Sequence, residues 1–146
     1  MRIINLIVVH CSATREGCTL TSEALEAEHR RRGFRTTGYH YYIRRDGTVL
    51  GTRSLELPGA HCRGHNKYSI GICYEGGLDA RGNPKDTRTP EQRSALHLLV
   101  YQLLQQFRNA RVCGHRDLSP DLDGDGTVEP WEWVKQCPCF EVSKEF

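Results

Sequence analysis

The hydrophobic and polar positions of this 146-residue chain form short apolar runs separated by polar segments. Residues 3–9 are apolar and rich in β-branched side chains, without glycine or proline, which is typical of a strand buried on both faces. Residues 69–74, SIGICY, form a second such run, which Gly76 and Gly77 end. Residues 111–113 predict a further short strand. These runs predict the interior strands of one sheet.

Two other segments have the composition of helices. Residues 19–32 begin with capping candidates and carry glutamates early and arginines late, as the helix dipole favours, and Gly33 suits the position after the C-cap. Residues 89–107 begin Thr-Pro, and Gln92 completes a capping box. The apolar positions of this second helix recur at intervals of three and four and predict a core stripe packed on a sheet: Leu96, Leu99, Val100, Leu103, Leu104 and Phe107.

The remaining segments favour hairpins and loops. Residues 39–52 contain two short strand-like runs around an Asp-Gly turn, which predicts a β-hairpin. Residues 58–67 are rich in turn formers and are expected to be a loop, and residues 79–88 are polar and are expected to be an exposed loop. Strands mixed with two substantial helices predict the α/β class, with one domain over residues 1–146 and a central mixed β-sheet flanked by helices.

Charge and composition narrow the function classes. A net charge of +2 is atypical of a dedicated nucleic-acid binder, which usually presents a basic stripe to phosphates. The N-terminal apolar run is interrupted by Asn5 and His10 and is too short to span a bilayer. We therefore expect a cytoplasmic protein that is made without a signal peptide and has no nucleic-acid or membrane partner. We also expect it to be a monomer.

The chain has seven cysteines, an odd number that cannot pair completely within one chain, so reduced thiols are expected. Cys137 and Cys139 form a C-x-C pair, without the C-x-x-C spacing of thioredoxin-like redox sites. Metal binding by at least one of these two cysteines is therefore a more attractive hypothesis than a redox role.

Candidate metal ligands lie far apart in the sequence. No C-x-x-C pair is present, so a zinc site must gather distant residues, and His10, His115 and Cys137 are candidates. Three protein ligands would leave the fourth tetrahedral position to water, as in catalytic zinc sites. Spacing alone does not single out these three among seven histidines and seven cysteines.

A second metal hypothesis concerns an acidic loop. Residues 121–132, DLDGDGTVEPWE, fit the EF-hand calcium pattern D-x-D-x-D-G-x(5)-E. A bound Ca²⁺ would neutralise the loop and hold the geometry of the segment that follows His115; the alternative is a solvated acidic loop. The expected ligands are the side chains of Asp121, Asp123 and Asp125, the carbonyl of Thr127, a water-mediated contact of Glu129, and a bidentate Glu132, with Gly126 at the sharp turn.

Several motifs occur together and in order along the chain. They are VVHCSAT at residues 8–14, GYHYYIRRDGTV at 38–49, HCRGHNKYSIGIC at 61–73, the TPEQ helix start, GHRD at 114–117 and KQCPCF at 135–140. In this combination the chain resembles the zinc-dependent N-acetylmuramoyl-L-alanine amidases of the type 2 family, which includes amidase-type phage lysozymes and peptidoglycan recognition proteins. The acidic loop is an insertion relative to the small phage amidases.

The resemblance implies a zinc ion bound by His10, His115 and Cys137. It implies hydrolysis of the amide that joins N-acetylmuramic acid to L-alanine, the first residue of the peptidoglycan stem peptide. Tyr39 and Lys135 are implied to act beside the metal by stabilising the oxyanion. The departing amine needs a proton, and three sources remain open: Lys135, Tyr39 and water.

His61 and Asn66 fall in the family's cleft-side segment, which implies contact with substrate. The leading hypothesis is a phage or prophage endolysin that acts on the cell wall after release, for example through a holin. A muropeptide-recycling amidase would use the same chemistry. The alternative from another class is a non-catalytic peptidoglycan-binding module, and Cys137 favours the enzyme because loss of this ligand is a common route to non-catalytic members. Inhibition of a polymerase rests on family analogy alone.

Overall fold

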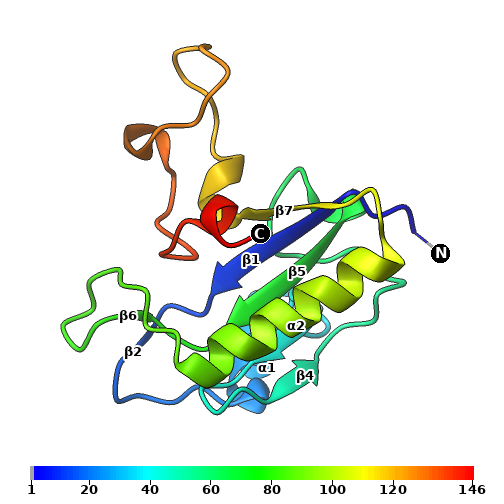
Figure 1. Cartoon of the computed structure of the whole chain (residues 1–146). Helices are drawn as coiled ribbons and strands as arrows, with labels where there is room; N and C mark the ends of the chain where they lie inside the picture. The colour runs from blue at the N-terminus through cyan, green and yellow to red at the C-terminus, as the bar shows by residue number, and fades with distance from the viewer. Residues whose placement is uncertain (1) are drawn as a thin grey trace.

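The computed structural model describes residues 2–146. Its centre is a five-stranded mixed sheet in the order β4-β3-β5-β1-β7 (Figure 1). β1 is parallel to β5 and β7, β3 is parallel to β5, and β4 runs antiparallel to β3. The predicted α/β class with a mixed sheet is confirmed. The strands are β1 (Leu6–Cys11), β3 (Tyr41–Ile43), β4 (Val49–Gly51), β5 (Ser69–Tyr74) and β7 (Arg111–Gly114).

A small second sheet was not expected from the sequence. It pairs β2 (Thr14–Arg15) with β6 (Gly77–Leu78) in parallel, directly after the ends of β1 and β5. Two-residue strands have no measurable hydrophobic period, so only the tertiary pairing defines them.

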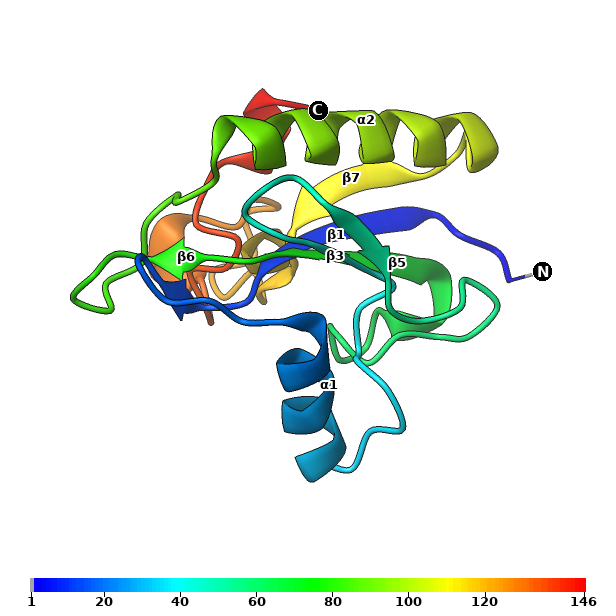
Figure 2. The ribbon, with the colours of Figure 1, turned by 90° about the horizontal axis from the view of Figure 1, so that it is seen from below.

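The two helices cover opposite faces of the sheet, as the view from below makes clear (Figure 2). α1 (Ser22–Arg31) begins after Thr21, whose hydroxyl accepts a hydrogen bond from Ala24 N–H. α2 (Pro90–Gln106) begins with the predicted capping box of Thr89 and Gln92. No helix in the described part of the chain has the length and apolarity needed to cross a membrane. Short 3-10 helices occur at Asn66–Tyr68, His115–Leu118, Pro130–Glu132 and Val142–Lys144.

The main core lies between α2 and one face of the sheet. Ile7 and Val9 of β1 belong to this core cluster, together with Ile72 of β5 and the predicted stripe of α2. Successive side chains of a strand point to opposite faces. His10 therefore lies on the face away from α2, the face where α1 packs.

The end of the segment at residues 79–88 differs from the expected exposed loop. Arg88 is 5% exposed, forms ion pairs with Asp86 and Glu145, and its guanidinium lies 3.4 Å from the ring centroid of Phe140. Polarity predicted exposure, but a partner near the C-terminus buries this arginine.

Candidate active site

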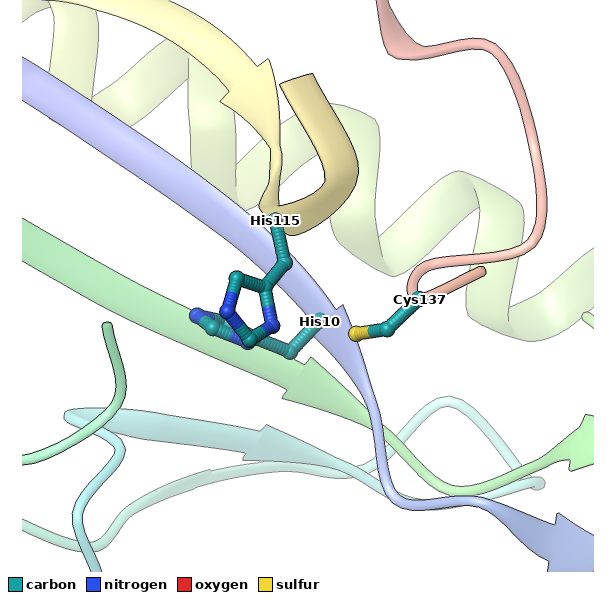
Figure 3. Close-up of side chains that lie close together, drawn as sticks. All are labelled: His10, His115 and Cys137. Atoms are coloured by element: carbon teal, nitrogen blue, oxygen red, sulfur yellow. The ribbon is translucent and has the colours of Figure 1, made fainter. Parts of the chain in front are cut away.

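Three side chains that are distant in the sequence converge on the α1 side of the sheet. His10 comes from β1, His115 follows β7, and Cys137 lies in the returning C-terminal segment (Figure 3). One potential ligand atom of each, two imidazole nitrogens and one sulfur, lies within 4.8 Å of the others. The parallel pairing of β1 with β7 places Gly114 opposite Val9, so the next residues, His10 and His115, stand side by side with ring centroids 4.6 Å apart.

Backbone hydrogen bonds hold Cys137 at this position. Arg116 N–H, one residue after His115, donates to the carbonyl of Cys137 at 2.9 Å. Cys11 N–H, one residue after His10, donates to the sulfur of Cys137 at 3.2 Å. The neighbours of both histidines therefore position the cysteine.

His61 connects this cluster to the interior of the sheet. A hydrogen bond of 2.9 Å joins His10 Nε2 to His61 Nδ1, and a second of 3.1 Å joins His61 Nε2 to the hydroxyl of Ser69. The ring lies over Gly71, where an added Cβ would stand 2.6 Å from it. The sequence predicted a substrate contact for His61; its contacts also give it a part in orienting His10. The sequence feature that could have indicated this contact is Gly71, because a glycine within a buried apolar strand often marks a close approach by another group.

Burial keeps these imidazoles neutral. Desolvation, followed by the nearby His61, His115 and Lys135, places the pKa of His10 well below its usual value. Desolvation also lowers the pKa of His61 to about 3. Because the neutral imidazole is the metal-binding form, both groups have the protonation state that a metal site requires at physiological pH.

Tyr39 and Lys135 lie beside the cluster. The Tyr39 ring centroid is 5.1 Å from that of His10, and burial raises the pKa of its hydroxyl well above the usual value, so the group remains a hydrogen-bond donor. Lys135 lines the adjoining cleft, and its charge contributes to the lowered pKa of His10. Asn66 also lines the cleft, while its Oδ1 accepts from His61 N–H and Cys62 N–H, each at 3.0 Å.

The cleft has a volume of about 770 Å³. His61 and His115 line it close to the cluster. Its wall combines basic side chains with apolar ones, namely Arg32, Arg63 and Lys135 with Phe34, Leu118 and Val134. Such a surface suits a ligand with both anionic and apolar parts.

The acidic residues form a separate group. Asp121, Asp123, Asp125 and Glu132 each place one carboxylate oxygen within 4.8 Å of the others. The aspartates are exposed, whereas Glu132 is buried. This segment projects away from the sheet (Figure 1).

The cluster of His10, His115 and Cys137 has a spacing and a donor set that fit a metal ion. In a tetrahedral zinc site, bonds of about 2.0–2.3 Å place the ligand atoms roughly 3.5 Å apart. The observed spacing within 4.8 Å needs only small side-chain movements to reach that geometry. Two imidazoles, of which burial keeps that of His10 neutral, and a sulfur that accepts a backbone hydrogen bond are a suitable donor set for Zn²⁺.

The chain is similar in sequence and fold to several known proteins. A family model described as N-acetylmuramoyl-L-alanine amidase matches residues 1–138. An endolysin of Klebsiella phage KP32 is 36% identical over 138 residues, which cover 94% of this chain and 82% of that protein. The solved N-acetylmuramoyl-L-alanine amidase LysC from Clostridium intestinale URNW is 26% identical with a TM-score of 0.76, covering 98% of this chain and 83% of the other. Drosophila peptidoglycan recognition protein SA shares the fold, with a TM-score of 0.75 and 18% identity over 100% of this chain and 80% of its own.

Proposed function

Because the chain belongs to the N-acetylmuramoyl-L-alanine amidase family, we propose that it hydrolyses the amide bond between the lactyl group of N-acetylmuramic acid and L-alanine in peptidoglycan. The observation that carries the proposal is the cluster of His10, His115 and Cys137 beside the cleft, with Tyr39 and Lys135 next to it. A His-His-Cys set beside a cleft with a basic and apolar wall suits hydrolysis of an amide in an anionic, partly apolar substrate.

His10, His115 and Cys137 would hold the zinc ion. When bound in such a site, zinc lowers the pKa of a water molecule to about 7 and polarises a carbonyl group. His61 keeps the His10 ring in its orientation through the hydrogen bond at Nε2. Calcium is proposed only as a structural ion of the acidic loop, outside this reaction.

Tyr39 and Lys135 would contribute to the reaction by stabilising negative charge. The Tyr39 hydroxyl remains protonated, so it donates a hydrogen bond to the carbonyl oxygen as negative charge develops there. The Lys135 ammonium, on the wall of the cleft, stabilises the same charge. Tyr39, Lys135 or a water molecule then supplies the proton to the departing L-alanine amine.

The cleft suits this substrate. Arg32 and Arg63 on its wall attract the free carboxylates of a stem peptide, and the apolar part accepts methyl and methylene groups. His61 and Asn66 contact substrate only with atoms that their internal hydrogen bonds leave available. For Asn66 that is the amide nitrogen, because Oδ1 already accepts backbone hydrogen bonds.

The biological setting that we infer is that of an endolysin, as the name of the phage relative indicates for that protein. The chain is then made in the cytoplasm and reaches the cell wall after release, for example through a holin, and it acts as a monomer. A non-catalytic binding module is the less favoured function, because the ligand set including Cys137 is complete and closely spaced.

The test is incubation of the zinc-loaded protein with purified peptidoglycan, followed by mass spectrometry of the products. An amidase releases stem peptides with a free L-alanine amine and leaves the lactyl carboxylate on intact glycan. Release of sugar reducing ends, or of fragments cut within the peptide, would contradict the assignment. Binding without any release would favour the recognition module.

A further inference from the structure

We propose that residues 121–132 form a calcium site, and that the bound Ca²⁺ holds the segment that forms one wall of the cleft. The proposal is independent of the zinc chemistry, because its residues are different and its test needs no substrate.

The loop backbone already has the conformation that a cation site requires. Asp121 Oδ1 and Oδ2 accept from Gly124 N–H at 2.9 Å and from Gly126 N–H at 2.7 Å. Asp123 accepts from Asp125 N–H at 3.1 Å, and Asp125 accepts from Thr127 N–H at 2.9 Å. These bonds turn the loop around its own carboxylates.

The turn occurs at Gly126, whose φ of 89° lies in the left-handed region that favours glycine. It occupies the sixth position of the EF-hand pattern, where the calcium loop needs its sharp turn.

Glu132 provides the second and independent observation. Its side chain comes from the other end of the loop and is only 3% exposed. Oε2 accepts from Leu122 N–H at 2.7 Å, whereas Oε1 is buried and has no hydrogen-bond partner. A carboxylate oxygen lies within 4.8 Å of those of Asp121, Asp123 and Asp125. A buried, unpartnered carboxylate oxygen is costly unless a cation or a proton occupies the space beside it.

Among the residues that the structure describes, no basic side chain pairs with these carboxylates. The segment 121–132 contains no lysine or arginine. Glu129 also has a buried oxygen without a partner. Carboxylates crowded in this way repel one another, and a divalent cation removes that repulsion.

The donor set favours Ca²⁺ over other ions. All of the candidate ligands are oxygens, and Ca²⁺ takes six to eight oxygen ligands at about 2.3–2.6 Å, including a bidentate carboxylate at the last loop position. Glu132 occupies that position. Mg²⁺ prefers a smaller octahedral shell that keeps several waters, and Zn²⁺ prefers the nitrogen and sulfur ligands of the other cluster.

The ends of the loop lead directly into the cleft. Val134 N–H donates to the hydroxyl of Ser119 at 3.1 Å, and both residues line the cleft together with Lys135. The Trp133 ring lies 3.9 Å from the guanidinium of Arg116. A cation bound between Asp121 and Glu132 would therefore fix the two chain segments that carry these residues, and with them the position of Lys135.

The chain's two tryptophans, Trp131 and Trp133, flank Glu132 and provide a local reporter. Zinc-loaded full-length protein is prepared in buffer freed of calcium by a chelating resin, with its zinc content verified. Terbium, a luminescent probe for calcium sites, is then added while tryptophan is excited. We expect saturable luminescence with one terbium per chain, which added Ca²⁺ abolishes. Absence of sensitised luminescence, or its persistence in excess Ca²⁺, would overturn the site.

Variants give the second arm of the test. Glu132→Gln keeps the shape of the side chain but removes its charge, and should weaken calcium binding by about tenfold or more. Calcium at about 100 times its Kd should raise the Tm of the wild type by roughly 5 °C or more but leave that of Glu132→Gln nearly unchanged. Asp123→Asn, at an exposed position, serves if Glu132→Gln does not fold.

The matched control is Asp79→Asn. Asp79 is another aspartate that accepts hydrogen bonds from nearby backbone N–H groups, but it lies outside the acidic cluster. Its variant should respond to calcium as the wild type does. An equal Tm increase in Glu132→Gln and the wild type would assign the effect to other surface carboxylates and reject the site.

Hydrogen exchange tests the proposed effect on the cleft. Calcium should slow the exchange of backbone amides in residues 119–135, while those in residues 79–88 keep their rate. Calcium binding without slower exchange in residues 119–135 would reject the role in holding the cleft wall.

Discussion

The two clusters of potential metal ligands are built in opposite ways. His10 and Cys137 are distant in the sequence and meet only because β1 is an interior strand of the sheet, between β5 and β7, and the C-terminal segment returns to it. Asp121 and Glu132 lie in one continuous segment, and short-range hydrogen bonds shape their loop. The first cluster depends on the whole fold, whereas the second depends on local backbone geometry. Substituting a ligand of one cluster should therefore leave metal binding at the other cluster largely unchanged.

The largest expected effect follows from removing a ligand of the long-range cluster. Cys137→Ala should lower hydrolysis of peptidoglycan on the order of a thousandfold, because the metal that activates water is lost. Zinc per chain, measured by mass spectrometry of the metal, should fall with it. His10→Ala and His115→Ala should behave in the same way.

Cys18→Ala, at an exposed cysteine, is the control and should keep zinc and activity. Terbium luminescence of the acidic loop should be unchanged in Cys137→Ala if the two clusters are independent. Full zinc occupancy in all three ligand variants would contradict the assignment of His10, His115 and Cys137 as zinc ligands.

The next effect separates catalysis from metal binding. Tyr39→Phe and Lys135→Ala should each lower kcat by about 10²–10³-fold, since each removes a group that stabilises developing charge. Both should retain zinc, because neither belongs to the ligand cluster. Lys144→Ala, at an exposed lysine near the C-terminus, is the matched control. A variant that hydrolyses peptidoglycan at the wild-type rate would clear its residue of a catalytic role.

A smaller effect is expected at His61. His61→Gln should weaken zinc binding by about 10–100-fold, because the hydrogen bond that orients His10 is lost. Zinc affinity is measured by competition with a chromogenic chelator, with His65→Gln as the control on the same loop. Unchanged affinity would mean that His61 packs against His10 without orienting it.

The smallest effect is a dependence of stability on pH, best measured without metal. The pKa of His61 is lowered to about 3 in the folded protein, so the unfolded chain binds the proton more readily. The stabilising contribution of neutral His61 is complete above about pH 6.5, the usual histidine pKa, and is lost as the pH falls toward 3.

The free energy of unfolding should therefore fall more steeply over this range in wild type than in His61→Gln. Denaturant unfolding of both metal-free proteins at several pH values measures the difference. Parallel curves would show that His61 does not resist protonation.

Local features of the fold were readable from the sequence. The capping box of Thr89 and Gln92 and the apolar stripe of α2 depend on contacts within one helix and on its period, so both were predicted correctly. The strand Ser69–Tyr74 was predicted at its observed bounds because its apolar run is continuous. β2 and β6, and the burial of Arg88, were missed because their partners are distant in sequence.

The candidate site divides in the same way. The acidic pattern of residues 121–132 could be predicted from the amino-acid sequence alone, because spacing along one loop sets its geometry. Residue patterns alone left His10, His115 and Cys137 among many histidines and cysteines, and only the resemblance to a family selected them. Only the folded chain brings them together. Parallel pairing of β1 with β7 places His10 beside His115, backbone hydrogen bonds from Cys11 and Arg116 hold Cys137 there, and the loop that carries His61 folds back so that its ring bonds to His10.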